Sequence, residues 1–264
     1  MLKLEGGTFL GLNRQSLDAE GIIISRTEYQ RTVYEGWHCH PNSHLTLILD
    51  GGNREQRPHA ELQALPGTVL LYNAEEQHRN QHTVHPSKNL NLELDPAFFA
   101  AYHTAPSAFA QAVSPHPDAK FALLKIYHEC LTPDAHSVAT IHSLLLALLS
   151  SCSEHQQRSA PPPWARTLQE LLHDCWNEPL SLQELSQRLG IHPVTISKGF
   201  ARYFGTTLGE YQRKLKVEHA LHLIRQPQYP LTQIGYECGF FDQSHFVRTF
   251  KRVTGWLPNE YRKL

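Results

Sequence analysis

The apolar and polar positions of this 264-residue chain follow two periods, one typical of strands and one typical of helices. In the first 95 residues, short apolar or alternating runs are separated by turn-forming residues, which predicts β-strands. The runs lie at Ile22–Ile24, Leu45–Leu49, Val69–Tyr72 and Leu90–Leu94, with turns expected at Asp50–Asn53 and Pro66–Gly67. Strands at this spacing predict a small antiparallel barrel or jelly roll over residues 1–95.

From Pro96 to residue 150 the period changes to that of helices. In the expected helix Ala119–Leu131, one stripe holds Phe121, Leu124 and His128. In the expected helix Val138–Leu149, apolar side chains are spaced i, i+3, i+4 and i+7, at Ile141, Leu144, Leu145 and Leu148. This second stripe has two interpretations: it packs on the barrel, or it pairs with its copy in a homodimer, because an apolar stripe can be self-complementary across a two-fold axis.

Residues 151–163 are small, polar and proline-rich, which is the composition of an interdomain linker. Residues 164–264 then show helical periods throughout. Ser181 stands three residues before Glu184, which predicts a capping box at the start of a helix over Leu182–Leu189. The predicted fold is therefore of the α+β class with two domains: an N-terminal antiparallel β-barrel plus helices, and a C-terminal all-α domain.

One pattern occurs twice in the C-terminal part, with an offset of 49 residues at its start and 50 at its end. The matching positions are Leu185 and Ile234, Gly190 and Gly239, Phe200 and Phe250, Arg202 and Arg252, Gly205 and Gly255, and Tyr211 and Tyr261. The second copy therefore has one extra residue in its turn. Two copies are too few for a solenoid. A tandem helix-turn-helix fits better, because each copy would place one helix in the DNA major groove, about 34 Å apart.

The second copy resembles the AraC/XylS family of transcription regulators, and the resemblance covers Trp164 to Arg262. Its most specific positions are Ile234, Cys238–Phe240, Asp242–Phe246, Arg248, Phe250–Lys251, Gly255, Pro258 and Tyr261–Arg262. Two positions depart from the family pattern. Gly235 replaces the usual Ala, which should loosen its helix by up to about 1 kcal/mol, and His192 replaces a common Ser, which should weaken an N-cap.

This resemblance implies a regulator with double-stranded DNA and RNA polymerase as partners, and it is compatible with a homodimer through Val138–Leu149, because similar regulators commonly place a dimer helix after the sensor barrel. On the first recognition helix Ile196 and Phe200 should face the core, and on the second Phe246 and Phe250 should do so. The side chains left for DNA bases are Val194, Thr195, Ser197 and Lys198 on the first helix, and Gln243, Ser244, Val247 and Arg248 on the second. Better placed for phosphates are Arg202, Lys214, Lys251 and Arg252. Each of these alone could be ordinary surface charge.

Charge is divided unevenly between the two parts of the chain. The net charge of the chain is −1. From Ser159 onward the sequence has 13 Lys and Arg and 9 Asp and Glu, whereas the part before Ser159 has 11 Lys and Arg and 16 Asp and Glu. An acidic part joined to a basic part is typical of a sensor joined to a DNA reader. Five cysteines without a CxxC pair favour a reducing compartment. Because apolar runs are too short for a membrane span and no signal-peptide core is present, we expect a cytoplasmic protein with no membrane partner.

A histidine constellation lies within the predicted barrel: His38, His40 and His44, then Gly51, and later Pro66–Gly67 followed by His78. It resembles the two-part cupin motif, with His44 in place of the acid. In a strand, His38 and His40 point to one face because side chains alternate, and His44 has the same parity.

Imidazoles facing one cavity could bind Zn²⁺, Ni²⁺ or Fe²⁺ through His38, His40, His44 and His78. The same four side chains could instead hold a small-molecule effector with no metal required, or be core residues. The predicted function is a sequence-specific DNA-binding regulator, of the AraC type and an activator, whose DNA binding or activation is modulated by a small-molecule effector in the cupin-like domain. The alternative is a metal-dependent cupin enzyme with an accessory helical domain.

Overall fold

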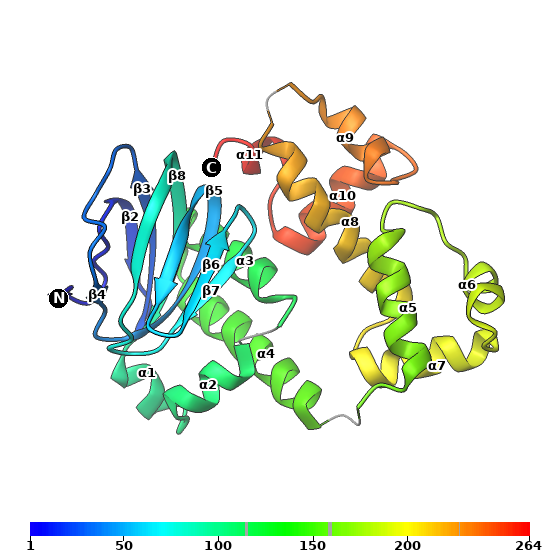
Figure 1. The fold of residues 1–264 in the computed structure, drawn as a ribbon, viewed down its shortest axis with the longest axis horizontal. Coiled ribbons are helices and arrows are strands. Elements are labelled where there is room, and N and C mark those ends of the chain that lie inside the picture. Colours follow the sequence, from blue (N-terminus) through cyan, green and yellow to red (C-terminus); the bar gives the residue numbers. More distant parts are fainter. Residues whose placement is uncertain (114–115, 158–159, 227) are drawn as a thin grey trace. The chain divides into compact units, whose positions relative to one another are not determined.

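The computed structural model describes residues 1–113, 116–157, 160–226 and 228–264 (Figure 1). It divides the chain into two compact units, Met1–Leu149 and Ser150–Leu264. In the described residues, none of the helices has the length and apolarity that crossing a membrane requires.

The first unit is built on a six-stranded sheet in the order β2-β3-β8-β5-β6, with β7 paired to β5. The strands are β1 (Leu2–Lys3), β2 (Leu12–Asp18), β3 (Ile22–Tyr29), β4 (His38–Cys39), β5 (Ser43–Arg57), β6 (Ala60–Ala64), β7 (Val69–Tyr72) and β8 (Arg79–Leu94). All four predicted strand runs lie in strands, within β3, β5, β7 and β8. The six-stranded sheet pairs antiparallel throughout, as predicted for the barrel, and the separate short pair β1 and β4 is parallel.

The expected turn at Asp50–Asn53 is wrong, because β5 continues through it. The first half of β5 pairs with β7 and with the end of β8, and its second half pairs with β6 and the start of β8. Gly51 (φ 73°) and Gly52 (φ 119°) lie at the register shifts between these halves. Glycines that adopt positive φ can bend a strand through bulges without ending it. The sequence signal for a turn was therefore a signal for a bend.

Four helices follow the sheet: α1 (Pro96–Ala101), α2 (Pro106–Val113), α3 (Ala119–Leu131) and α4 (Ser137–Gln157). Helix α3 has the predicted bounds, and its Phe121 and Leu124 are buried against the domain. On α4, Ile141, Leu145 and Leu148 are also buried within the chain, so the predicted stripe packs on its own domain. The ring of His142 helps to hold α4 there, because its Nε2 donates to the Ala19 carbonyl at 2.8 Å.

The expected linker over 151–163 is wrong in its first part, because α4 runs to Gln157. The small and polar residues there can continue a helix that its apolar half has already begun, since propagation is easier than nucleation. The rest of that prediction includes residues 158 and 159, which lie outside the described residues.

The second unit is helical: α5 (Pro163–Asp174), α6 (Leu182–Leu189), α7 (Pro193–Phe204), α8 (Leu208–Ile224), α9 (Leu231–Glu237), α10 (Gln243–Thr254) and α11 (Pro258–Tyr261). The two sequence copies form α6–α7 and α9–α10, and α8 connects them (Figure 1). The predicted inward side chains Ile196, Phe200, Phe246 and Phe250 are each fully buried.

Helix ends follow the signals in the sequence. Ser181 and Glu184 form the predicted capping box of α6, and Gly190 ends that helix at φ 66°. In the second copy, Asp242 accepts a hydrogen bond from the His245 amide at 2.6 Å and caps α10. His192 also caps its helix, because its Nδ1 accepts from the Val194 amide at 3.3 Å.

Gly235 has a packing role that its propensity alone does not indicate. A Cβ at this position would lie 3.3 Å from the Cβ of Phe246. The glycine therefore lets α9 approach the buried ring that anchors α10.

Candidate DNA-binding helices and histidine cavity

The first recognition helix presents a free face at its N-terminal half. Exposed on α7 are Val194, Thr195, Ser197, Lys198 and Arg202, while Ile196 and Phe200 lie beneath them. Residues near the start of such a helix are the ones that reach base edges in helix-turn-helix proteins.

The second recognition helix has the same division of faces. Gln243, Ser244, Arg248, Lys251 and Arg252 of α10 are exposed, and Val247 is half-buried. The Gln243 amide oxygen accepts from Thr232 Oγ1 of α9 at 2.8 Å, and Arg248 Nε donates to the Ser244 carbonyl at 3.3 Å. Both side chains are therefore partly ordered before any partner binds.

Two of the cationic side chains predicted to contact phosphate are less exposed or already paired with a carboxylate. Arg252 lies 3.4 Å from the Glu210 carboxylate of α8, which also pairs with Arg213. Lys214 lies half-buried on α8. These two side chains are thus less free than Arg202 and Lys251 to reach a DNA backbone.

The turn of the second motif is locked to the rest of its domain at Gly239. The Lys216 ammonium of α8 donates to the Gly239 carbonyl at 2.7 Å. Gly239 has φ 69°, and a Cβ there would lie 2.1 Å from the Asn177 carbonyl oxygen, in the loop after α5. Next to that loop, the Trp176 ring stacks on His219 of α8 at 3.7 Å. These contacts fix α9 and α10 to the helix that carries them.

The four predicted histidines surround one cavity in the β domain. This cavity has a volume of about 20 Å³, and all four rings, each nearly fully buried, line it. One nitrogen from each of His38, His40 and His78 lies within 4.8 Å of the others, the arrangement of a three-imidazole metal site. His44 lies outside this group and stacks on Tyr72, with ring centroids 4.4 Å apart. The structure therefore brings three of the four together as candidate ligands.

Backbone carbonyls orient the rings. His38 Nδ1 is 3.1 Å from the Gly36 carbonyl, His78 Nδ1 is 3.1 Å from the Glu76 carbonyl, and His44 Nδ1 is 3.4 Å from the Asn42 carbonyl. A carbonyl only accepts, so each of these Nδ1 atoms carries the proton and each Nε2 keeps its lone pair. His40 Nδ1 is buried and has no hydrogen-bond partner among the described residues.

Burial keeps these rings neutral. It lowers the pKa of His38 to about 4, that of His40 to about 3 and that of His78 to about 4, with neighbouring rings adding to the effect on His38 and His40. The pKa of His44 is also held well below its ordinary value by burial. At neutral pH all four are uncharged imidazoles, the form that binds a metal.

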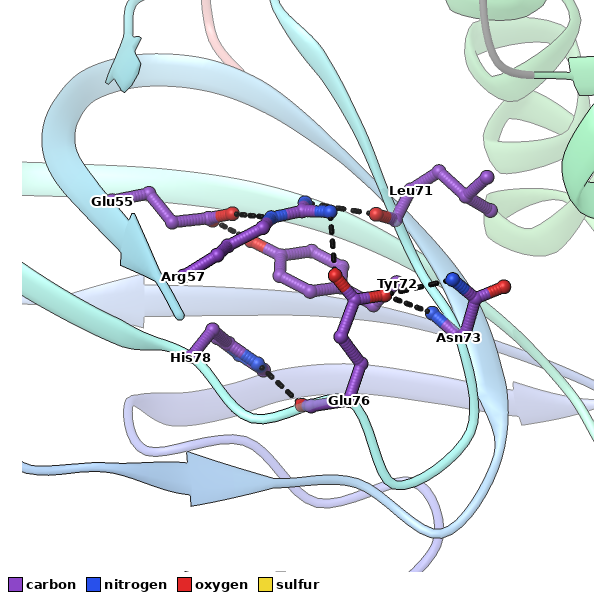
Figure 2. Close-up of polar contacts among 7 residues, drawn as sticks. All are labelled: Glu55, Arg57, Leu71, Tyr72, Asn73, Glu76 and His78. Atoms are coloured by element: carbon purple, nitrogen blue, oxygen red, sulfur yellow. Dashed lines mark hydrogen bonds and ion pairs between the residues drawn. The ribbon is translucent and has the colours of Figure 1, made fainter. Parts of the chain in front are cut away.

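An ionic network that the sequence did not predict supports the loop carrying His78 (Figure 2). Arg57 Nε lies 2.7 Å from the fully buried Glu55 carboxylate and its Nη1 lies 2.8 Å from Glu76. The Tyr72 hydroxyl donates to Glu55, and the Arg57 guanidinium lies 4.8 Å from the centre of the Tyr72 ring. Glu76 also accepts from the Asn73 amide and side chain at 2.9 Å each. The carbonyl that orients His78 thus belongs to Glu76, whose side chain is itself held by Arg57 and Asn73.

Other polar side chains that line the cavity were not predicted from the sequence. The cavity is lined by Thr46, Asn53, Asn80, Asn89 and Asn91 in addition to the histidines. The signal was strand parity, because Asn80 is two residues from His78 and Thr46 is two residues from His44. Phe9, from the segment before β2, packs on His40 and His44 with ring centroids 4.9 and 5.5 Å apart.

Two family models match the chain. A model described as an AraC-like ligand binding domain matches residues 21–172, and one described as a helix-turn-helix domain matches residues 185–264. The first range contains the four cavity histidines, and the second contains α7 and α10.

Curated proteins named as transcriptional activators match the chain in sequence. The chain is 23% identical over 269 residues to the HTH-type transcriptional activator RhaR of Klebsiella pneumoniae, covering 93% of each protein. It is 32% identical over 92 residues to the HTH-type transcriptional activator RhaS of Escherichia fergusonii, covering 35% of this chain and 33% of that protein. A solved structure, the C-terminal domain of AraT from Geobacillus stearothermophilus, is 24% identical with a TM-score of 0.38, covering 40% of this chain and 88% of that one.

The first family model alone spans more than half of the chain, and the second covers the tandem helix-turn-helix. This chain belongs to the AraC family of DNA-binding transcription regulators and combines an AraC-like ligand-binding domain with a helix-turn-helix domain.

Proposed function

We propose that this regulator reads DNA sequence with two side-chain sets, one on each recognition helix. The observation that carries the proposal is the matched pair α7 and α10, each with buried apolar anchors and an exposed, mostly polar face. The base-reading residues are Val194, Thr195, Ser197 and Lys198 on α7, and Gln243, Ser244, Val247 and Arg248 on α10. Lys198 and Arg248 suit guanine and Gln243 suits adenine, because their donors and acceptors match those base edges. Phosphate contacts come from Arg202 and Lys251 first, with Arg252 after release from Glu210.

The cavity of the β domain is the proposed effector site, with His38, His40, His44 and His78 as its binding residues. A divalent Zn²⁺, Ni²⁺ or Fe²⁺ ion fits this set, because three neutral imidazole nitrogens converge and their other nitrogens are largely held by carbonyls. His38, His40 and His78 would hold the ion, and bound metal would supply a Lewis-acid centre for an oxygen or nitrogen donor. His44 would line the site rather than ligate.

The effector acts by changing the populations of conformations that differ in DNA affinity, and it can shift them only by its differential affinity for those conformations. The relatives RhaR and RhaS are named as transcriptional activators. By extension, we propose that this chain activates transcription, contacts RNA polymerase and is located in the cytoplasm. We propose no catalytic reaction for it.

A homodimer is the proposed assembly, through the outer face of Val138–Leu149. Since Ile141, Leu145 and Leu148 are buried in the chain, the contact would use half-buried neighbours such as Leu146 and Leu149. Sedimentation of the wild type and of Leu146→Glu measures this directly. A monomeric wild type would reject the dimer.

The function is tested by selecting genome fragments with the purified full-length protein and then measuring the salt dependence of binding to the recovered sites. We expect a site with two half-sites about one helical turn apart. We also expect affinity that falls steeply with salt, because phosphate contacts release counterions. If no fragment is enriched and metal analysis gives one ion per chain, the cupin-enzyme alternative replaces this proposal.

A further inference from the structure

The histidine cavity pairs its three convergent rings with buried acceptors that have no partner. The side-chain oxygens of Asn53, Asn80 and Asn89 are buried and make no hydrogen bond among the described residues. Asn53 and Asn89 are each 6% exposed, and all three line the same cavity as the rings. Buried polar atoms are nearly always paired with protein or with ordered water, so three orphan acceptors around one space indicate a missing donor.

A fourth asparagine in this cavity shows that the orphans are not a general property of its wall. Asn91 Oδ1 accepts from Thr46 Oγ1 at 2.9 Å, and its Nδ2 donates to Thr27 Oγ1 at 3.0 Å and to Ser25 Oγ at 3.4 Å. This neighbour is satisfied by the protein itself. The unpaired oxygens therefore mark the part of the cavity where a ligand or a water held by it would donate.

Size limits what that ligand is. A volume of about 20 Å³ holds about one water molecule or one ion. Phe9 covers His40 and His44, and Tyr72 packs on His44 and His78, with ring centroids 4.4 and 4.3 Å apart. A sugar-sized or drug-sized effector needs about 300 Å³ or more and would have to displace these rings.

We propose that the effector sensed by this domain is itself a divalent transition-metal ion, and that its binding changes operator affinity. His38, His40 and His78 ligate the ion, and one water bound to the ion donates its hydrogens to orphan asparagine oxygens. A metal-bound water acts toward the protein as a hydrogen-bond donor only. This suits a cavity wall whose unpaired atoms are acceptor oxygens. The group that converges contains only imidazoles, which favours Zn²⁺, Ni²⁺ or Fe²⁺ over the oxygen-preferring Mg²⁺. This inference rests on the proposed function, because it requires an operator to respond.

The test uses full-length protein freed of metal with EDTA and an operator fragment recovered by genome selection. Operator affinity is measured across buffered series of free Zn²⁺, Ni²⁺ and anaerobic Fe²⁺, and metal affinity is measured in parallel by competition with a chromogenic chelator. We expect one of these ions to bind at one per chain and to change operator affinity by about 5- to 150-fold, with coincident midpoints. Mg²⁺ should change nothing.

Two variants separate the role of the histidine ligands from the role of the asparagines. His38→Gln should abolish metal binding and, with it, the change of operator affinity on addition of metal. Asn80→Leu should weaken metal affinity by about 10- to 100-fold, as loss of an outer-sphere partner does. Asn259→Leu, an exposed site in the other domain, is its control and should leave metal affinity unchanged.

Three results overturn the proposal. If metal binds but operator affinity stays constant, the ion is a static component, and if no metal binds, the effector is organic. In both cases operator binding survives and the proposed function stands. If no operator is recovered with or without metal, the proposed function fails and the metal-sensing role fails with it.

Discussion

At the scale of single residues, the exposed Arg248 on α10 provides the sharpest test of base reading. Arg248→Ala should weaken specific binding by about 1–3 kcal/mol, because a bidentate contact to guanine contributes that much discrimination. Binding to random DNA should change far less. The measurement is competition binding with specific and random duplexes, with Arg166→Ala on the exposed face of α5 as the control. An equal loss on both duplexes would show that Arg248 contacts only phosphate.

Gly239→Ala is the second test at this scale. The substitution imposes φ 69° on an alanine and places its Cβ 2.1 Å from the Asn177 carbonyl, so the melting temperature of the helical domain should fall. The cost should exceed the roughly 1 kcal/mol of an unfavourable φ alone. Gly190→Ala separates the two effects, because Gly190 has φ 66° and nothing lies within 4 Å of its Cβ. Equal losses in the two variants would mean that the contact with Asn177 is unimportant.

Residue-scale features could be predicted where a single rule decides them. Helical periodicity placed Ile196, Phe200, Phe246 and Phe250 in the core, and each is fully buried. Strand parity grouped His38 with His40, but it could not show that His44 stacks on Tyr72, because that depends on the β5–β7 register. The asparagines that line the cavity could not be predicted from the sequence, because asparagine is common in turns and their burial depends on the folded sheet.

At the scale of elements, the loop between β7 and β8 depends on Arg57. Removing its charge in Arg57→Leu leaves the buried Glu55 carboxylate without its cation, and this should destabilise the β domain by about 3–5 kcal/mol. The same variant should weaken ligand binding at His78, because Glu76 loses its ion pair. Chemical unfolding followed by circular dichroism measures the first effect. Arg54→Leu is the matched control, since its pair with Glu61 is exposed and such pairs contribute about 0–1 kcal/mol. Similar losses in both would contradict the role given to Glu55.

Element boundaries were predictable when caps or periods marked them, as for α3 and α6. The predictions failed where context overrode a local signal. Gly51 and Gly52 bend β5 instead of ending it, and polar residues after Leu149 extend α4 to Gln157. For β5, pairing with the distant strand β8 decides the outcome. For α4, the apolar first part of the same helix decides it.

At the scale of the whole molecule, acid should weaken the β domain of the metal-free protein. The pKa values of His38, His40 and His78 are depressed to about 4, 3 and 4 in the folded state. In the unfolded chain these rings titrate near pH 6.5. Between pH 6.5 and about 4 the unfolded chain therefore binds more protons, so stability is full above pH 6.5 and falls as pH decreases.

Melting temperatures from pH 7.5 to 4.5 check this, with a loss on the order of 1–3 kcal/mol expected per ring. His59→Gln, at an exposed site, should melt in parallel with the wild type at every pH. A flat profile for the wild type would mean that the rings are protonated or accessible in the folded domain.

The division into a sensing unit and a DNA-reading unit was visible in the sequence because charge and period both change along the chain. The central claim is that α7 and α10 of one chain enter successive segments of one DNA face. Hydroxyl-radical footprinting of the full-length protein on a recovered operator measures this most directly. We predict two protected tracts about one helical turn apart, with Lys198→Ala weakening one and Arg248→Ala the other. A single tract, or two tracts that both variants weaken equally, would contradict it.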